Sequence, residues 1–396
     1  MNNKQIIEAG DRYVMKTYGR LPLALVRGKG ARVWDADGRE YLDFVGGLAV
    51  NSLGHCHPAV VKAIAGQAET LMHVSNLYYI EPQVKLAQML AGNSCADRVF
   101  FCNSGAEANE AAIKLARKYA KMNGGPGRYE IITARQSFHG RTLATITATG
   151  QTKYQQGFEP LPEGFRYVPF NDLGALREAV GPNTCAVMLE PIQGEGGVNE
   201  AEPDYLRGVK RLCSQEGLLL IFDEVQCGLG RTGKLLAYQH YGVEPDIFTL
   251  AKALGGGFPI GAMLAREDVA AAFVPGDHAS TFGGNPLACA AGLAAVDQLI
   301  NHGLIENAAR VGAYFRGRLE DLKGRRAIAA GVRGRGLMLG LELTVEGRGI
   351  VASCQEQGLL INCVNNNVLR FLPPLIISEA EVDQAVGILE EAMGGS

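Results

Sequence analysis

Short apolar segments alternate with longer helical patterns through the middle of the chain, and this alternation constrains the fold more than any other feature. Apolar residues run almost without interruption through the expected strands, which span residues 98–102, 129–133, 186–190, 218–222, 246–250 and 260–264. Helical patterns span residues 58–72, 82–91, 106–122, 203–216 and 286–299. Strands that are apolar on both faces and separated by helices are typical of a buried, mostly parallel sheet. We therefore expect an α/β fold.

The two ends of the chain follow a different pattern. Residues 332–343 and 368–371 look like strands flanked by helices, which predicts a smaller α+β domain. Near the start, two alternating runs flank an Asp37-Gly38 turn, which predicts a hairpin. We expect an N-terminal segment (1–50) that packs with the small domain, a large domain (51–285) and a C-terminal small domain (286–396).

Composition narrows the class of protein. With 396 residues, the chain is long enough for two or three domains. The 38 basic and 41 acidic residues give a net charge of −3, which argues against nucleic acid or an anionic membrane as partner. Clean apolar runs are short, as at residues 218–222, whereas a membrane span needs about 20 residues. Nine cysteines without a Cys-x-x-Cys pair, and no apolar leader, predict a cytoplasmic protein with free thiols.

Polar and glycine-rich segments follow the expected strands where each strand ends. They cover residues 103–107, 137–141, 191–197, 223–226 and 251–257. In parallel α/β sheets, ligands bind outside the carboxyl ends of the strands. Because the strands themselves are apolar, we expect one convergent site at this edge of the sheet.

Three features of these segments together indicate a pyridoxal phosphate site. Ser104 and Gly105 precede a strongly helical stretch, and a small turn at a helix N-terminus exposes backbone N–H groups to a phosphate. Lys252 ends an apolar strand before three glycines, where burial would disfavour its charged form and leave a nucleophilic amine. Asp223 ends a neighbouring apolar run, and this cofactor pairs a Schiff-base lysine with an acidic partner for its pyridinium nitrogen. Taken singly, an ordinary helix cap and a solvated loop lysine are the alternatives.

Two further motifs suggest other chemistry. Residues 228–233 match the G-x-G-x-x-G pattern of nicotinamide oxidoreductases, but five residues separate them from the preceding strand, whereas that motif opens directly from strand to helix. His55-Cys56-His57 invites a metal, yet no further ligand stands nearby at a suitable spacing, so we expect no metal site. His57 before Pro58 is better interpreted as the start of a helix.

The chain resembles the class III, fold type I, pyridoxal-phosphate-dependent aminotransferases, and within them the acetylornithine aminotransferase group. The motifs that carry the resemblance are YLDF at 41–44, GLAVNSLGH at 47–55, NSGAEA at 103–108, FHGRT at 138–142, EPIQGEGG at 190–197, DEVQ at 223–226, Lys252 with its glycines, STFGGNP at 280–286 and LRFLPP at 369–374. Ala106 stands where many relatives carry Thr. The resemblance implies a large domain with a mostly parallel seven-stranded sheet plus a smaller α+β domain.

The resemblance also implies roles for individual residues. Lys252 would form the Schiff base and move a proton, while Asp223 would keep the pyridine nitrogen protonated. Phe138 and Val225 would pack on the two ring faces, and Thr281 would reach the phosphate from the partner subunit of a homodimer. The full set of implied cofactor-binding residues is Ser104, Gly105, Ala106, Phe138, Asp223, Glu224, Val225, Gln226, Lys252 and Thr281.

The implied substrates are small dicarboxylates and amino acids. Arg141 and Arg370 would bind their carboxylates, because guanidinium meets carboxylate in bidentate fashion. Glu195 would pair with Arg370 when the substrate has no second carboxylate, and Ser280 would lie beside the substrate. The implied reaction moves the δ-amino group of N2-acetyl-L-ornithine to 2-oxoglutarate, a step of arginine biosynthesis. Succinylornithine, ornithine, succinyl-diaminopimelate and 4-aminobutyrate are alternative donors. A nicotinamide oxidoreductase and a catalytically silent binding protein are the alternatives from other classes.

Overall fold

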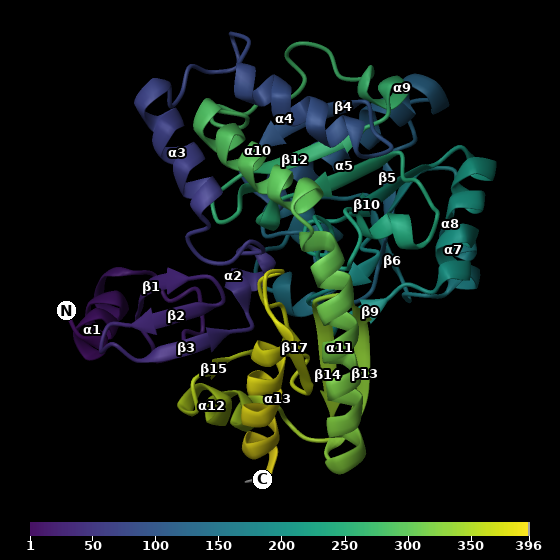
Figure 1. The fold of residues 1–396 in the computed structure, drawn as a ribbon. Coiled ribbons are helices and arrows are strands. Elements are labelled where there is room, and N and C mark those ends of the chain that lie inside the picture. Colours follow the sequence, from purple (N-terminus) through teal and green to yellow (C-terminus); the bar gives the residue numbers. More distant parts are fainter. Residues whose placement is uncertain (395–396) are drawn as a thin grey trace.

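A seven-stranded sheet forms the centre of the computed structural model, which describes residues 1–394 (Figure 1). Its strands, in spatial order, are β4 (Arg98–Cys102), β12 (Gly261–Ala265), β11 (Ile247–Leu250), β10 (Leu219–Asp223), β7 (Thr184–Leu189), β5 (Glu130–Ala134) and β6 (Phe165–Val168). All neighbouring strands are parallel except β12, which is antiparallel to both β4 and β11. The expected mostly parallel seven-stranded sheet is confirmed.

Helices cover both faces of this sheet. Strand β10 shows why: Leu219 and Ile221 join the apolar cluster under α5 (Gly105–Gly124), while Leu220 and Phe222 join the cluster under α8 (Pro203–Glu216). Successive side chains of a strand point to opposite faces, so an uninterrupted apolar strand needs cover on both sides. Further helices are α3 (Pro58–Thr70), α4 (Glu81–Gly92), α6 (Leu143–Ala148), α7 (Leu173–Ala179), α9 (Glu267–Ala270) and α10 (Pro286–Asn301).

Two smaller sheets lie beside this sheet and hold both ends of the chain (Figure 1). One contains β13 (Ala329–Arg335), β14 (Met338–Leu343), β17 (Val368–Phe371) and β16 (Asn362–Val364), all antiparallel. The other contains β1 (Leu25–Lys29), β2 (Arg32–Asp35), β3 (Glu40–Asp43) and β15 (Leu359–Leu360). Strand β15 is parallel to β3, so the first and last parts of the chain share this sheet. The remaining elements are α1 (Asn3–Tyr13), α2 (Gly46–Ala49), the pair β8 (Ile192–Gln193) and β9 (Asn199–Glu200), α11 (Leu304–Arg325), α12 (Arg348–Glu356) and α13 (Glu379–Gly394).

Two of the sequence expectations concern the strands near the ends of the chain. The hairpin around Asp37-Gly38 is confirmed by the antiparallel pair β2 and β3. The strand-like pattern at residues 332–343 corresponds to two strands, because Gly336, with φ +57°, turns the chain between β13 and β14. Counted singly, none of the helices in residues 1–394 is long and apolar enough to cross a membrane; the bent pair α10 and α11 reaches that composition only when counted together.

Candidate active site

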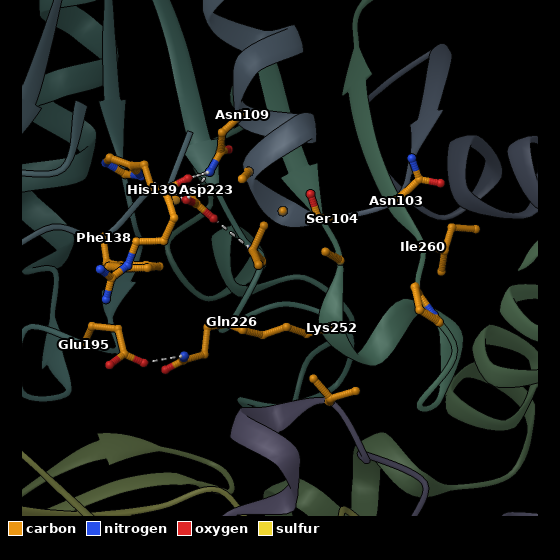
Figure 2. Close-up of a pocket in the computed structure, with 18 of the residues that line it drawn as sticks. Asn103, Ser104, Asn109, Phe138, His139, Glu195, Asp223, Gln226, Lys252 and Ile260 are labelled. Atoms are coloured by element: carbon orange, nitrogen blue, oxygen red, sulfur yellow. Dashed lines mark hydrogen bonds and ion pairs between the residues drawn. The ribbon is translucent and has the colours of Figure 1, made fainter. Parts of the chain in front are cut away.

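A cavity of about 420 Å³ lies where the carboxyl ends of the central strands meet the small sheets (Figure 2). Its walls come from the start of α5, from the segments after β5, β10 and β11, and from Val50. The expected convergence of strand ends on one site is therefore confirmed. The residues that line the cavity and were expected from the sequence are Ser104, Gly105, Ala106, Phe138, Arg141, Glu195, Asp223, Val225, Gln226 and Lys252.

Asp223 sits at the centre of a buried hydrogen-bond network on one side of the cavity (Figure 2). Its Oδ2 accepts from Asn109 Nδ2 at 2.7 Å and lies 2.9 Å from His139 Nδ1, while its Oδ1 accepts from the Val225 backbone at 3.0 Å. Thr249 donates to Asn109 Oδ1 at 2.7 Å and so fixes the orientation of that amide. The carboxylate is thus held in one position at the cavity wall.

Lys252 enters the cavity directly after β11, at the start of a single 3₁₀ turn. Its backbone has φ +45°, a left-handed conformation that costs free energy for a residue with a side chain. Burial lowers the pKa of its amine, and the carboxylates of Glu195 and Asp223 only partly oppose this shift. A lysine with a lowered pKa carries more of the neutral, nucleophilic amine at a given pH.

The start of α5 forms a second wall suited to an anion. Ser104 caps this helix, and its Oγ accepts from the Glu107 backbone at 3.2 Å. Gly105 allows close packing, because a Cβ there would lie 2.7 Å from Val225 Cγ1. The first N–H groups of a helix lack intrahelical acceptors and carry the positive end of the helix dipole. Gly105 and Ala106 therefore present a site for a phosphate group.

Arg370 forms a buried ion pair at the opposite side. Its Nη1 lies 2.6 Å from Glu195 Oε1 and donates to Gln226 Oε1 at 3.2 Å. Arg370 is 1% exposed, on β17 of the small sheet, whereas Glu195 lies in the glycine-rich loop after β8. Burial acts to raise the pKa of Glu195, but the charges of Arg370 and Lys252 outweigh it and lower the pKa overall. The pair thus joins a carboxylate of the glycine-rich loop to a buried guanidinium on β17.

Arg141 and Phe138 line the cavity after β5. The Arg141 guanidinium lies over the Tyr154 ring at 4.1 Å and over the Phe138 ring at 5.5 Å, and its side chain is exposed. Beneath them, Glu190 accepts from the Phe138 backbone at 2.9 Å and from the Gly194 backbone at 3.3 Å. Burial raises the pKa of Glu190 to about 7. Glu190 therefore connects the Phe138 segment to the loop that carries Glu195.

Four expected site residues do not line this cavity: Glu224, Ser280, Thr281 and Arg370, the last of which contacts the lining residues Glu195 and Gln226. The Glu224 carboxylate accepts from the Ala237 and Tyr238 backbones at 2.6 and 2.7 Å, and burial raises its pKa to about 7. A contact between this side chain and the cofactor is therefore not supported. Ser280 Oγ accepts from the Gly283 backbone at 2.9 Å and from Asn103 Nδ2 at 3.3 Å, next to the cavity. Thr281 is exposed and lies on a separate surface depression.

The cavity also contains residues to which the sequence analysis gave no role: Val50, Asn103, Asn109, His139, Glu190 and the segment 257–260. Asn109 follows Gly105 by four residues on α5, so helical periodicity could have placed it on the same face. Within residues 1–394, His139 Nε2 is buried without a hydrogen-bond partner. Its contact with Asp223 joins residues that are 84 positions apart, so no local sequence pattern indicated it.

The two other motifs have structural roles. The segment 228–233 opens no helix, and it packs against α11 and the β13–β14 hairpin. His55 Nε2 pairs with Asp43 Oδ2 at 2.7 Å, and the His57 ring accepts from the Ala59 backbone at the start of α3, which confirms the expected helix start. Among the described residues, no group of three or more His, Cys, Asp or Glu side chains is placed to hold a metal ion.

The family description "Aminotransferase class-III" matches residues 13–393, almost the whole chain. The chain belongs to the class-III aminotransferases. This confirms the resemblance inferred from the motifs, the fold type and the enzyme class, a pyridoxal-phosphate-dependent aminotransferase.

Individual relatives of this class-III aminotransferase agree with the assignment. A protein of Caldanaerobacter subterraneus subsp. tengcongensis named acetylornithine aminotransferase is 59% identical over 96% of this chain and 97% of its own. The N-acetylornithine aminotransferase structure from Stenotrophomonas maltophilia has a TM-score of 0.84 at 42% identity, covering 98% of both chains. The ornithine aminotransferase structure from Toxoplasma gondii has a TM-score of 0.96 at 38% identity, covering 100% of this chain and 96% of its own.

The residues of the cavity fit pyridoxal phosphate, the cofactor of this class. The start of α5 suits the phosphate, the Asp223 carboxylate suits a protonated ring nitrogen, and the Lys252 amine suits the aldehyde. The close approach of Gly105 to Val225 leaves no room for a larger residue at the phosphate wall. Three chemically different groups of one small molecule thus each find a matching partner.

Proposed function

We propose that this class-III aminotransferase transfers the δ-amino group of N2-acetyl-L-ornithine to 2-oxoglutarate, giving N-acetyl-L-glutamate 5-semialdehyde and L-glutamate in arginine biosynthesis. The ion pair of Arg370 and Glu195 carries the proposal, because the donor brings one carboxylate and the acceptor brings two. The relatives named acetylornithine aminotransferase, at 50–59% identity, support this donor. Ornithine is the second candidate, because the structure with a TM-score of 0.96 is an ornithine aminotransferase. Succinylornithine and 4-aminobutyrate complete the series to be tested.

The proposed placement of the cofactor follows from the cavity walls. Asp223 would hold the proton on the ring nitrogen, and its three hydrogen-bond contacts fix the position of its carboxylate at the cavity wall. Phe138 and Val225 would pack on opposite ring faces, and Gln226 would hydrogen-bond the ring hydroxyl. Backbone N–H groups of Gly105 and Ala106 would bind the phosphate, with Ser104 holding the turn. When bound, pyridoxal phosphate stores the amino group between the two half-reactions and withdraws electrons from the substrate carbon.

Lys252 would perform the proton transfers. Its side chain lines the cavity, where the charges of Glu195, Asp223 and Arg370 act on its amine. Because its pKa is lowered by burial, the amine can accept a proton from the substrate carbon that bears the amino group. The same amine can then return that proton on the cofactor side, so one residue serves both directions of the reaction.

Two arginines would divide the substrate carboxylates between them. Arg141, exposed at the cavity wall, would bind the α-carboxylate of the donor or the distal carboxylate of the acceptor. Arg370 would bind the α-carboxylate of 2-oxoglutarate once Glu195 has moved away. With the donor bound, Glu195 keeps Arg370 paired, and an unpaired buried cation would cost several kcal/mol.

We also propose that the protein is a cytoplasmic homodimer in which Thr281 reaches the partner's cofactor. Each subunit would comprise an N-terminal segment (1–50), a large domain (51–285) and a C-terminal small domain (286–396). Thr281 lines a surface depression of about 1220 Å³ together with the exposed side chains of Leu77 and Tyr79. Tyr79 is fully exposed in the single chain. Apolar side chains gathered on a surface are typical of an interface.

The donor substrate can be tested first with the visible spectrum of the purified protein. We expect a yellow band that bleaches when N-acetylornithine is added without any oxo acid. Bleaching would show cofactor, reactive lysine and donor half-reaction together. A band that persists with N-acetylornithine but bleaches with ornithine, succinylornithine or 4-aminobutyrate would replace the proposed donor and leave the enzyme class intact.

Glu195→Gln is expected to separate the two half-reactions. The amide can still accept a hydrogen bond from Arg370 but removes the ion pair. We expect kcat/KM for N-acetylornithine to fall about tenfold and KM for 2-oxoglutarate to fall, since no charged carboxylate need be displaced. Glu200→Gln is the matched control, because Glu200 pairs with Arg335 outside the cavity. Equal changes for both substrates would contradict the proposed role of Glu195.

A further inference from the structure

Arg231, in the middle of the glycine-rich segment 228–233, is a fully buried arginine that the proposed chemistry does not use. Its side chain is 1% exposed. Its Nη1 donates to the backbone carbonyls of Leu337, at 3.0 Å, and Pro373, and its Nη2 donates to Ser52 Oγ at 3.0 Å. One guanidinium therefore ties together three segments that are far apart in the sequence.

Two of these three segments are close in sequence to residues in or next to the cavity, and the third hydrogen-bonds to Arg231 itself. Pro373 follows Arg370 by three positions, and Ser52 follows Val50 by two. Leu337 occupies the tight turn between β13 and β14, and its backbone N–H donates back to the Arg231 carbonyl at 3.0 Å. Arg231 itself follows Gln226 by five positions on the segment that continues from Asp223. The contacts thus join the segment that follows Asp223, which lines the cavity, to the segment that follows Arg370, which contacts the lining residues Glu195 and Gln226.

A second layer of backbone hydrogen bonds joins the same segments. Leu372 donates to the Phe44 carbonyl at 2.8 Å, and Leu375 donates to the Ser52 carbonyl at 2.7 Å. The turn between Phe44 and Ser52 is strained, because Leu48 and Ala49 have φ of +64° and +67°. Strained backbone persists only where its surroundings hold it, and the segment 372–375 provides that hold.

Arg231 lacks the counter-ion that a buried cation normally has. Within residues 1–394, no carboxylate acts on its charge, its Nε has no hydrogen-bond partner, and burial lowers its pKa to about 9. Arg370, equally buried, has Glu195. A buried charge held only by neutral acceptors destabilises the fold compared with an apolar side chain of similar size. What the guanidinium provides instead is a planar fork with donors in fixed directions.

We propose that Arg231 is a positioning residue for Arg370. By holding Pro373, Leu337 and Ser52 at once, it fixes the end of β17 relative to the Asp223 segment, and so sets the distance across the subsite for the 2-oxo acid. This rests on the proposed role of Arg370 as the residue that binds the α-carboxylate of 2-oxoglutarate. N-acetylornithine, whose carboxylate would bind Arg141, depends less on this distance.

The test compares Arg231→Lys and Arg231→Met with Arg128→Met as the matched control. Arg128 likewise makes three hydrogen bonds as donor, to the backbone carbonyls of Thr184, Glu216 and Gly217, but it lies outside the cavity, just before β5. We expect both Arg231 variants to raise KM for 2-oxoglutarate about tenfold or more and KM for N-acetylornithine less than about threefold. Arg128→Met should change neither. In hydrogen–deuterium exchange, peptides covering residues 46–52 and 368–375 should exchange faster in the Arg231 variants alone.

The outcomes separate this inference from the function on which it rests. Lysine keeps the charge but cannot span three acceptors, so parental kinetics in Arg231→Lys would overturn positioning by the fork. That variant also carries the test if Arg231→Met does not fold. Equal rises in both KM values, or the same pattern in Arg128→Met, would overturn the inference in favour of general stabilisation. If Arg370→Lys in the same assay leaves KM for 2-oxoglutarate unchanged, the proposed subsite fails and this inference with it. If Arg370→Lys raises that KM while both Arg231 variants stay parental, this inference alone fails.

Discussion

Lys252→Ala is expected to reduce transamination by at least about 10³-fold, the largest effect of any single substitution in this chain. The variant loses the only lysine of the described residues that lines the cavity, and with it the group that would link to the cofactor and carry the proton. The rate is measured with N-acetylornithine and 2-oxoglutarate at saturating pyridoxal phosphate. A small primary amine added to the buffer should restore part of the rate, because it can carry the proton in place of the side chain.

Two controls make the Lys252 result specific. Lys234→Ala removes an exposed lysine outside the cavity and should retain the parental rate. Lys252→Arg keeps a cation at the site, but guanidinium stays protonated and should be as inactive as alanine. Transamination by Lys252→Ala at more than a tenth of the parental rate would refute the role of this lysine.

Asp223→Asn is expected to lower kcat by about 10²- to 10³-fold. The amide keeps the size of the side chain but loses the negative charge that would stabilise a protonated ring nitrogen. The groups around this side chain also require a hydrogen-bond acceptor, because Asn109 Nδ2 and the Val225 backbone N–H both donate to the carboxylate. The expected loss therefore combines a weaker electron sink with a disturbed network, and kcat should fall more than KM rises.

Asp246→Asn is the matched control for Asp223→Asn. Both carboxylates are about equally buried, at 5% and 4% exposure, but Asp246 precedes β11 at the opposite end of the sheet and pairs with Lys210 and Arg266. Thermal unfolding should show both variants destabilised, and steady-state kinetics should show only Asp223→Asn slowed. Equal kcat in the two variants would mean that Asp223 acts through the fold alone.

Much of the site could be predicted from the sequence because of one rule: ligands bind at the carboxyl ends of the strands in a parallel sheet. Asp223 is the last residue of β10 and Lys252 follows β11, so the rule places both side chains at the same edge of the sheet. The direction of β12 was not predicted. Only ten residues separate β12 from β11, whereas a parallel pair needs a crossover connection of about a dozen residues or more. The short connection therefore indicates that β12 is antiparallel to β11.

Other features depend on contacts that the sequence does not record. His139 and Asn109 reach Asp223 across 84 and 114 positions, and only the folded sheet brings them together. Glu224 was assigned to the cofactor because it lies in the same motif as Asp223. In an extended chain successive side chains point to opposite sides, and this residue lies on the side of Ala237 and Tyr238.

The parallel pairing of β15 with β3 has a consequence for how the chain folds during synthesis. The ribosome completes residues 98–265, and with them every strand of the central sheet, before residues 359–360 emerge. Until then the N-terminal sheet has three of its four strands, and its β3 edge has no partner strand. The pairing of β15 with β3 therefore cannot form until residues 359–360 are synthesised, and the contact of Arg370 with Glu195 cannot form until still later. A truncated chain released early would contain Lys252 but lack Arg370, the residue proposed to bind the 2-oxo acid.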